Sequence, residues 1–262
     1  MIYNYLLLNI EQYKMSTSRD HKTNIHHVVA IIDRSGSMAG KEEDTIGGIN
    51  TTFEELKTNP TPDTNVKVSI KLFDHEEKML IKEVNLNDVK PVTKEQYFPR
   101  GQTALYDAVG NTLNYFMEKK INDTNAYKYC SIYVVTDGLE NISKNYNSNN
   151  IKLMIENAEK YYDIKLFYLG ANQDAILEAS KIGITNDQAL NYCELSGNVD
   201  AAYRSAASAS KRHASGTPVA FTGPERMASQ SGDFVYMAQP SNMHQSSPPP
   251  QPPKVQRQRT ML

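Results

Sequence analysis

The sequence predicts an α/β protein with a doubly wound, mostly parallel β-sheet, helices on both faces of the sheet and one antiparallel hairpin at its edge. Between residues 27 and 192, short apolar runs alternate with segments of helical periodicity, which is the pattern of such a sheet. Two of the apolar runs, 66–73 and 78–84, are separated only by the letters DHEE. So short a connection requires an antiparallel pair, and doubly wound sheets often carry one at an edge.

The individual strands and helices follow from the spacing of the apolar residues. In the segment 66–73, apolar residues alternate with lysine and serine, which predicts a strand with one better-buried face. In the segment 41–57, apolar residues recur at helical spacing. The other predicted strands are 27–32, 78–84, 130–135, 164–169 and a short edge strand 188–192, and the other predicted helices are 103–120, 148–162, 172–182 and 197–213.

Two adjacent glycines, Gly47 and Gly48, lie inside the predicted helix 41–57. Each should cost about 1 kcal/mol of helix stability relative to alanine. We therefore expect a steric reason for them, namely a close approach of this helix to the sheet.

The chain divides into four predicted parts. Residues 1–24 form a leader, and because Met15 opens a polar stretch we expect translation to begin there; the apolar stretch before it is too short to span a membrane. Residues 25–193 form the α/β domain, and residues 194–214 a C-terminal helix that packs on it. Residues 215–262 form an extended, largely disordered tail that is rich in proline and then basic.

Composition narrows the classes of function. The formal net charge of −2 gives no general attraction to nucleic acid or to an anionic membrane. The two cysteines, Cys130 and Cys193, have no histidine cluster beside them that would complete a zinc site. Because Cys130 lies in an apolar run we predict a buried free thiol, and a reducing, cytoplasmic location fits best.

Polar oxygens gather directly after the first predicted strand. The letters IIDRSGSM place Asp33 at the end of that strand and Ser35 and Ser37 at a spacing of two. In an extended loop this spacing points both hydroxyls the same way as the carboxylate, and Gly36 allows a tight bend between them. Ligands of open α/β sheets bind at the carboxyl ends of strands. Three convergent oxygens there suit a hard cation such as Mg²⁺.

Two further loops can supply the remaining oxygens. The stretch FPRGQTALYDA places Thr103 at the start of a helix, and YVVTDGLEN places Asp137 at the end of the fourth strand. In a doubly wound sheet the first and fourth strands are neighbours, so Asp33 and Asp137 are expected to share one site.

With these motifs the chain resembles the von Willebrand factor type A domains and their metal-ion-dependent adhesion site. All five positions of that site match in type and order over roughly residues 25–192, and the match is nearest to intracellular bacterial, phage and viral members. The segments that carry the further likeness are EEDTIGGIN, LFDHE, YFPRG, FYLGANQDA and FTGPERMASQ. The resemblance implies the Rossmann-like fold of these domains.

The resemblance also implies a role for each residue of the site. Ser35, Ser37 and Thr103 would give hydroxyl oxygens to the metal, and Asp33 and Asp137 would bind it partly through water. The ion, Mg²⁺ with Mn²⁺ or Ca²⁺ as alternatives, would keep one open position for a carboxylate of a partner protein. The implied function is that of a metal-dependent protein-binding module with no catalytic residue.

The sequence leaves two alternative functions and one further partner open. The alternatives are a metal-dependent phosphoryl-transfer or hydrolytic enzyme that uses Asp33, and a nucleic-acid-associated scaffold. A dehalogenase-type phosphatase would need an aspartate where Ser35 stands, and no Walker A loop or histidine-based triad is visible. The proline tract 248–253 could bind an SH3- or WW-type domain, although a plain disordered tail is the favoured interpretation.

Several other polar residues near these motifs are not expected to bind metal. Asp107 and Glu140 are interpreted as solvated or supporting carboxylates. His26, His27 and His75 have no partner at a metal-ligand spacing and are expected to be structural or exposed.

Overall fold

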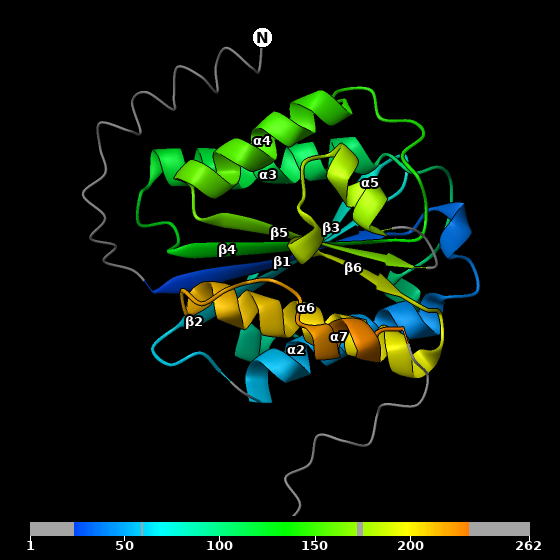
Figure 1. Ribbon diagram of the computed structural model, residues 1–262, viewed down its shortest axis with the longest axis horizontal. Helices are drawn as coiled ribbons and strands as arrows, with labels where there is room; N and C mark the ends of the chain where they lie inside the picture. Colours follow the sequence, from blue (N-terminus) through cyan, green and yellow to red (C-terminus); the bar gives the residue numbers. More distant parts are fainter. Residues whose placement is uncertain (1–23, 59, 172–174, 231–262) are drawn as a thin grey trace, which may run out of the picture.

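The computed structural model describes residues 24–58, 60–171 and 175–230, and these fold around one six-stranded sheet (Figure 1). The strand order is β3-β2-β1-β4-β5-β6. The strands are β1 (Ile25–Asp33), β2 (Asn65–Phe73), β3 (Glu77–Asn85), β4 (Tyr129–Thr136), β5 (Ile164–Ala171) and β6 (Ala189–Tyr192). The predicted fold class, including the antiparallel hairpin at one edge, is confirmed: only the pair β2–β3 runs antiparallel in this sheet.

Helices cover both faces of the sheet, as predicted. In Figure 1, α3, α4 and α5 lie above the sheet and α2, α6 and α7 lie below it. Their bounds are α2 (Glu42–Thr58), α3 (Leu105–Asn122), α4 (Ser148–Tyr161), α5 (Ala175–Lys181), α6 (Ser196–Ala214) and α7 (Gly223–Ala228). Four short 3₁₀ helices complete the described chain: η1 (Gly36–Met38), η2 (Leu86–Asp88), η3 (Lys94–Gln96) and η4 (Asn186–Gln188).

The sheet separates two apolar cores. Val29 and Ile31 of β1 belong to the core under α3 and α4, whereas Val28, Ala30 and Ile32 belong to the core over α2 and α6. Burial of both faces explains why β1 is a continuous apolar run, as is usual for the central strand of a parallel sheet. Each valine or isoleucine buried there contributes about 1.5–3 kcal/mol.

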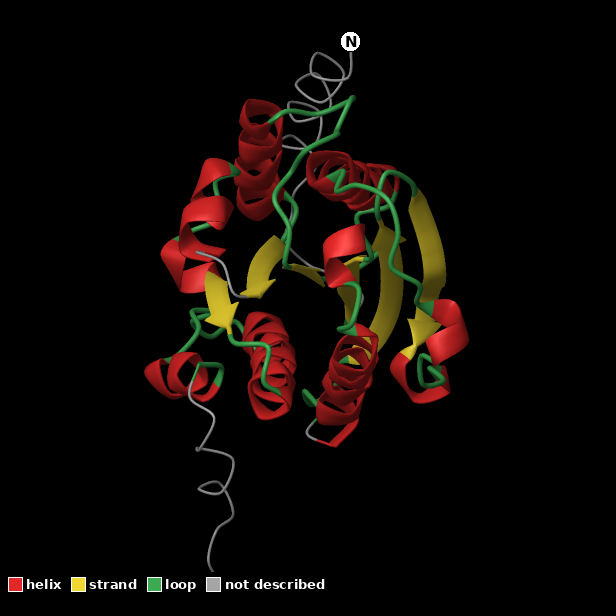
Figure 2. Cartoon of the chain, turned by 90° about the vertical axis from the view of Figure 1, so that its right-hand side faces the viewer, coloured by secondary structure: helices red, strands yellow, loops and turns green. Residues whose placement is uncertain are grey.

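The sheet order brings the carboxyl ends of β1 and β4 together. The two strands pair in parallel, with Ile32 of β1 opposite Val135 of β4. Asp33, the last residue of β1, therefore lies beside Thr136, the last residue of β4. Asp137 follows Thr136 directly in the chain. Figure 2 looks onto this edge of the molecule, where loops cover the strand ends.

The two glycines of α2 differ in their surroundings. Gly48 is buried, and a Cβ added to it would lie 2.2 Å from Cδ2 of Tyr203 on α6. Gly47 is exposed, and a Cβ there would meet nothing within 4 Å. The close approach expected from the sequence thus concerns Gly48 alone, and the neighbour is helix α6 and not the sheet.

The chain after α6 is folded further than predicted. The sequence interpretation placed an extended tail from residue 215, but residues 215–230 contain α7 and run back over β6. Arg226 donates hydrogen bonds to the carbonyls of Ala189 (2.8 Å) and Asn186 (2.7 Å), and Ser229 donates to the carbonyl of Asn191 (2.8 Å). Sequence reasoning missed this because the anchoring bonds use backbone carbonyls of η4 and β6, which leave no pattern in the sequence.

The two predicted end segments lie largely outside the described residues. These are the leader, which includes the expected start at Met15, and the proline tract 248–253. Within the described residues, no helix combines the length and the apolar character needed to cross a membrane.

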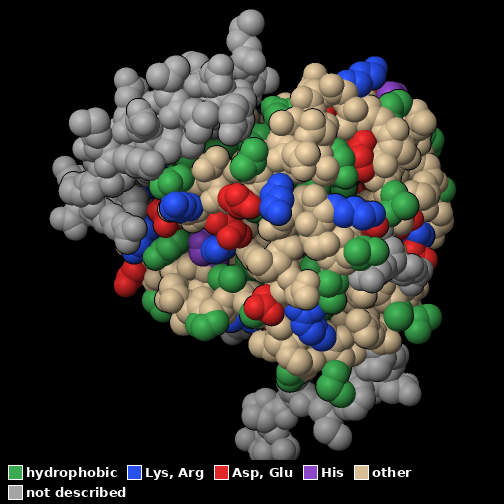
Figure 3. Space-filling view, turned by 45° about the horizontal axis from the view of Figure 1, so that its top comes forward, with side chains coloured by type: hydrophobic (Ala, Val, Ile, Leu, Met, Phe, Trp, Pro, Cys, Tyr) green, Lys and Arg blue, Asp and Glu red, His purple; other side chains and the backbone are tan. Residues whose placement is uncertain are grey.

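The surface on the side of α4 carries both signs of charge. Figure 3 shows Lys and Arg side chains interspersed with Asp and Glu over this face, and hydrophobic side chains scattered between them. Such a mixed surface produces no strong field of one sign on this face.

Two buried histidines join α6 to the sheet. The hydroxyl of Ser131 on β4 lies 2.9 Å from Nε2 of His26 on β1 and 2.9 Å from Nδ1 of His213 on α6. Burial lowers the pKa of both imidazoles to about 3, and it lowers the pKa of the adjacent His27 to about 4. These histidines are therefore neutral structural groups, as expected for His26 and His27, and Cys130 is a buried free thiol, as predicted.

The glycine pair of α2 gives a direct test of the α2–α6 contact. Gly47→Ala should raise the free energy of unfolding by about 1 kcal/mol, because the helix gains propensity and nothing is displaced. Gly48→Ala should lower it by about 1–3 kcal/mol, because the buried Tyr203 ring must move. Urea unfolding of both variants measures the difference; equal effects would contradict the α2–α6 packing.

The buried histidines should make the protein less stable in mild acid. Below pH 6.5 the unfolded chain binds protons at His26, His27 and His213, whereas the folded chain does not until about pH 4 to 3. Because the unfolded state then holds more protons, the free energy of unfolding falls as the pH falls, by up to about 1.4 kcal/mol per pH unit for each histidine.

Denaturant unfolding at several pH values between 6.5 and 5 measures this slope. His213→Gln should reduce the slope by about one proton. His75→Gln is the control, because the His75 side chain is 42% exposed. Equal slopes in wild type and the His213 variant would show that His213 is not buried in its neutral form.

Candidate metal centre

The first loop of the site is fixed by the carboxylate that ends β1. Asp33 is fully buried, and its two oxygens accept hydrogen bonds from the backbone N–H of Ser35 and from the hydroxyl of Thr136, each at 2.6 Å. Both donors are electrically neutral. In the described residues no lysine or arginine forms an ion pair with Asp33.

Hydroxyl groups continue from this carboxylate to the second aspartate. Oγ of Ser35 lies 3.1 Å from Oγ of Ser37, and the hydroxyl of Ser37 donates to Oδ1 of Asp137 at 2.6 Å. The loop after β1 is thereby joined to the loop after β4, as the predicted neighbourhood of the two strands requires.

Gly138 marks the point where oxygens from the three loops converge. A Cβ at this glycine would lie 3.1 Å from Oγ1 of Thr103, 3.2 Å from Oγ of Ser37 and 3.6 Å from Oδ2 of Asp33. Because glycine has no Cβ, the backbone of the third loop can lie this close to all three oxygens. The structure therefore brings together all five residues singled out in the sequence, including Ser35 and Asp137 through their hydrogen bonds.

The buried Asp33 carboxylate has no positively charged partner among the described residues, and burial makes its charged form less favourable. Desolvation raises its pKa to about 6, the hydrogen bonds from Thr136 and Ser35 act in the opposite direction, and the nearby charge of Asp137 raises it further. A bound cation would stabilise the charged form and lower this pKa. An ionised carboxylate at this position thus favours a cation beside it.

The Thr103 loop is held in place by backbone hydrogen bonds to both neighbouring loops. The N–H of Gly36 donates to the carbonyl of Gly101 at 3.0 Å. On the other side, the N–H of Thr103 donates to Oδ1 of Asn141 at 3.0 Å, and the N–H of Asn141 donates to the carbonyl of Thr103 at 3.1 Å. Tyr97, earlier in the same loop, donates its hydroxyl to the carbonyl of Asp33 at 2.6 Å. The position of the Thr103 hydroxyl is therefore set by the rest of the site.

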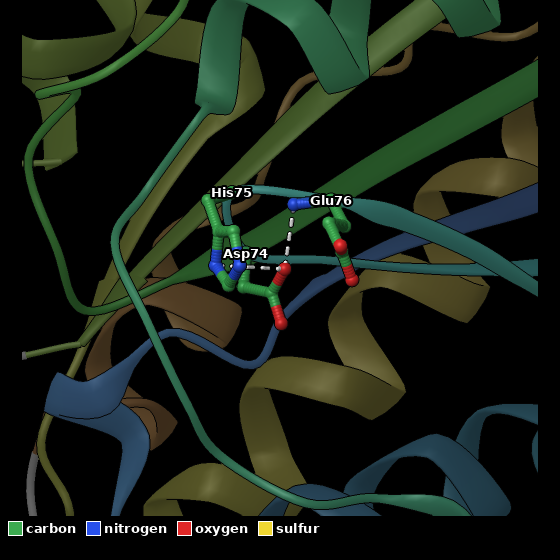
Figure 4. Close-up of side chains that lie close together, drawn as sticks. All are labelled: Asp74, His75 and Glu76. Carbon is green, nitrogen blue, oxygen red and sulfur yellow. Dashed lines mark hydrogen bonds and ion pairs between the residues drawn. The ribbon is translucent and has the colours of Figure 1, made fainter.

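A second cluster of ligand-type side chains lies in the β2–β3 turn, at Asp74, His75 and Glu76 (Figure 4). Asp74 is fully buried, with Nε of Arg34 at 3.1 Å and Nε of Arg100 at 2.9 Å from its carboxylate. Two guanidinium groups thus already neutralise it, and a cation would have to compete with both. We interpret this cluster as structural.

The Asp74 turn instead supports the Thr103 loop. Its backbone carbonyl accepts the N–H of Ala104 at 2.9 Å, directly beside Thr103. Arg100, which binds the Asp74 carboxylate, also donates its backbone N–H to the carbonyl of Arg34 at 2.7 Å. Both arginines that neutralise Asp74 therefore belong to loops that carry proposed ligands.

Asp107 and Glu140 hold the loop that follows Asp137. Glu140 accepts the N–H of Tyr106 at 2.9 Å, at the start of α3, and also bonds to Ser143 in its own loop. Asp107 accepts three backbone N–H groups from residues 144–146 of this loop. The carboxylates of Asp107 and Glu140 thus accept hydrogen bonds from backbone N–H groups, which agrees with the supporting role expected for these two residues.

A lysine outside the predicted set lies at the edge of the site. Lys41, at the start of α2, forms ion pairs with Asp137 and with Glu194, the second residue after β6. Its side chain is 25% exposed, so these pairs lie where the site meets solvent. Lys41 therefore links Asp137 to the C-terminal part of the fold.

Sequence reasoning did not identify Thr136, Asn141, Asp74, Lys41 or Glu194 as parts of the site. Thr136 precedes Asp137 in the letters VVTDG and could have been noticed from that position alone. The other four depend on contacts between loops that are far apart in the sequence, which a single sequence does not reveal.

Comparisons with known proteins give structural relatives only. No family model and no curated protein sequence matches this chain. Proximal thread matrix protein 1 of the mussel byssus superposes with a TM-score of 0.52 and 13% identity, over 72% of this chain and 47% of the other. The pilus adhesin SpaC of Lactobacillus rhamnosus GG, in its open conformation, gives 0.52 and 14%, over 73% and 30%.

A third structure bears the name of the family that the sequence motifs resemble. It is the von Willebrand factor type A protein from Catenulispora acidiphila, with a TM-score of 0.50 and 16% identity, over 72% of this chain and 43% of the other. This chain therefore spans less than half the length of each of the three. At such low identity the likeness concerns the fold: this chain has the fold of a von Willebrand factor type A domain.

Proposed function

We propose that this chain is a divalent-metal-dependent protein-binding module, in which Asp33, Ser35, Ser37, Thr103 and Asp137 hold the ion. The observation that carries the proposal is the convergence of Thr103, Ser37 and Asp33 oxygens on the point where Gly138 lacks a side chain. The likeness of fold to type A domains supports the same assignment.

The donor set fits a hard divalent cation. It consists of three hydroxyls and two carboxylates, with no sulfur or imidazole, and oxygen ligands are preferred by Mg²⁺, Mn²⁺ and Ca²⁺. We favour Mg²⁺ because it retains water readily and needs few protein carboxylates. When bound, the ion supplies a positive centre to which an external oxygen can add.

The partner that fits such a centre presents a carboxylate. The ion pair with Lys41 already satisfies part of the charge of Asp137, which leaves more of the positive charge of the cation for an external ligand. Two of the structural relatives are, by name, a matrix protein and a pilus adhesin, and an adhesive or scaffolding role is in keeping with these.

The two alternatives receive less support from the site. A dehalogenase-type phosphatase needs a second aspartate two residues after its nucleophile, and Ser35 stands there in this chain. For a nucleic-acid scaffold, a basic balance of charge would be expected, and the formal net charge of the chain is −2. A cytoplasmic location, and an SH3- or WW-type partner for the proline tract 248–253, stay predictions.

Removal of two ligand hydroxyls tests the metal site. The double variant Ser35→Ala, Ser37→Ala should bind Mn²⁺ at least about tenfold more weakly than wild type, because two oxygens of the donor set are lost. Electron paramagnetic resonance of free Mn²⁺ measures this. The matched control is Ser180→Ala, Ser215→Ala, whose hydroxyls bond only to the backbone carbonyls of Leu177 and Lys211, a few residues earlier in the chain.

The same variants test the function when used to capture partners from cell extract. A protein that is retained by wild type in Mg²⁺, and lost both in EDTA and with the Ser35, Ser37 variant, would establish a metal-dependent binding module. Equal Mn²⁺ affinity of the two double variants would refute the metal site.

Removal of Lys41 should strengthen metal binding, whereas removal of the two serines should weaken it. Lys41→Met should tighten Mn²⁺ binding by about tenfold, because a positive charge is removed from beside the cation and Asp137 loses a competing partner. Lys57→Met is the control: Lys57 lies at the other end of α2, pairs with Glu54 and is 26% exposed. Weaker binding to the Lys41 variant would show that Lys41 orients Asp137 and does not compete for it.

A further inference from the structure

Strand β6 forms one edge of the sheet, and residues 221–230, which we call the edge cap, bind the backbone of this strand. The carbonyl of Ala189 accepts a hydrogen bond from Nη1 of Arg226 at 2.8 Å, and the carbonyl of Asn191 accepts one from Oγ of Ser229 at 2.8 Å. The N–H of Cys193 donates to the carbonyl of Ser229 at 3.0 Å. These three strand residues stand at alternate positions, as expected for backbone groups that point to the same side of a parallel strand.

The edge cap is anchored to the fold at points away from these contacts. Phe221 is buried, its ring centroid lies 5.8 Å from that of Phe167 on β5, and its N–H donates to the carbonyl of Asp187 at 2.8 Å. Glu225 accepts two hydrogen bonds from the guanidinium of Arg212 on α6, at 2.9 Å and 3.0 Å. The cap is therefore held against β6 by a set of specific interactions.

The two edges of the sheet are protected in different ways. On β3 the register with β2 is interrupted at two places, and the exposed Lys78 and Lys82 lie on the strand. Bulges and edge lysines are devices that keep a sheet from pairing with a further strand. Strand β6 is 4 residues long, has the letters ALNY without charge or proline, and pairs regularly with β5. Apart from the shortness of the strand, the edge cap is thus the protection that the described residues give to β6.

A second copy of β6 could satisfy the same backbone groups. If two β6 strands pair antiparallel around a two-fold axis at Asn191, Ala189 of each copy lies opposite Cys193 of the other. Residues that face each other at alternate positions of such a pair exchange hydrogen bonds. The carbonyl of Ala189 then accepts the N–H of Cys193 from the other copy. A second β6 has this register by symmetry, whereas an unrelated strand does not.

We propose that the edge cap prevents dimerisation through β6, and that its release lets two copies pair their β6 strands antiparallel around Asn191. The cap and the second copy compete for the same backbone groups, so binding of one excludes the other. The two six-stranded sheets become continuous across the dimer. None of the five proposed metal ligands belongs to the cap or to β6, so dimerisation and metal binding are tested separately.

The test is carried out on the full-length chain by sedimentation equilibrium. Wild type should be a monomer, whereas Arg226→Ala, Ser229→Ala should self-associate at least about tenfold more strongly, because two hydrogen bonds that hold the cap on β6 are lost. The matched control is Arg204→Ala, Ser215→Ala. These side chains bond to Asp200 and to the carbonyl of Lys211, away from β6, so the control should sediment as wild type.

A second variant releases the cap without changing a contact to β6. Glu225→Gln weakens the ion pair with Arg212 and leaves Arg226 and Ser229 in place. It should shift self-association in the same direction as the double variant.

Cysteine crosslinking tests the register of the dimer in a Cys193→Ser background. Asn191→Cys should form an intermolecular disulfide when combined with Arg226→Ala, Ser229→Ala, because facing Cα atoms lie about 5.5 Å apart, within the range of a disulfide. With the cap intact the same cysteine should not crosslink. Leu153→Cys on α4, 40% exposed, is the control and should not crosslink in either form.

Three results would overturn the inference. The first is that both cap variants remain monomeric at the concentrations used. The second is that the cysteine at position 191 crosslinks equally well with the cap intact. The third is that the cysteine at position 153 crosslinks as readily as that at 191, which would show association without a defined register.

Discussion

The parallel pairing of β1 with β4 is the constraint on which the rest of the site depends. It places the carboxyl ends of two buried strands at one edge, so that Asp33 and Asp137 end up in adjacent loops. The hydrogen bond from Ser37 to Asp137 can form only because of this pairing. Apolar burial on both faces of β1 holds the pairing in register, since a shift by one residue would exchange the two cores.

Two buried aspartates near the site, Asp74 and Asp33, differ in the charge of the groups that contact them. Asp74 is neutralised by two arginines and supports the Thr103 loop. Asp33 has neutral donors only among the described residues, and its pKa is raised to about 6 as a consequence of burial. The carboxylate that lacks a protein cation is therefore the one that suits a metal ion, although Asp74, His75 and Glu76 look more like metal ligands by residue type.

The C-terminal part of the chain is connected to this site through a series of contacts. Helix α6 packs on α2 through Gly48 and Tyr203, and the segment around α7 is bonded to β6. Lys41 joins Asp137 to Glu194 directly after that strand.

The sequence by itself determined the fold class, because strand and helix periodicity are local patterns. It also singled out the five converging residues, three through the D-x-S-x-S motif and Thr103 and Asp137 through their places at the ends of predicted elements and the family resemblance. Only the tertiary structure decided how those residues are held: by Thr136, Asn141 and the Asp74 turn, and by Lys41 at the solvent edge. It also decided that residues 215–230 are folded and that Gly48 faces α6. These features depend on contacts between distant segments, and such contacts leave no periodic trace in a single sequence.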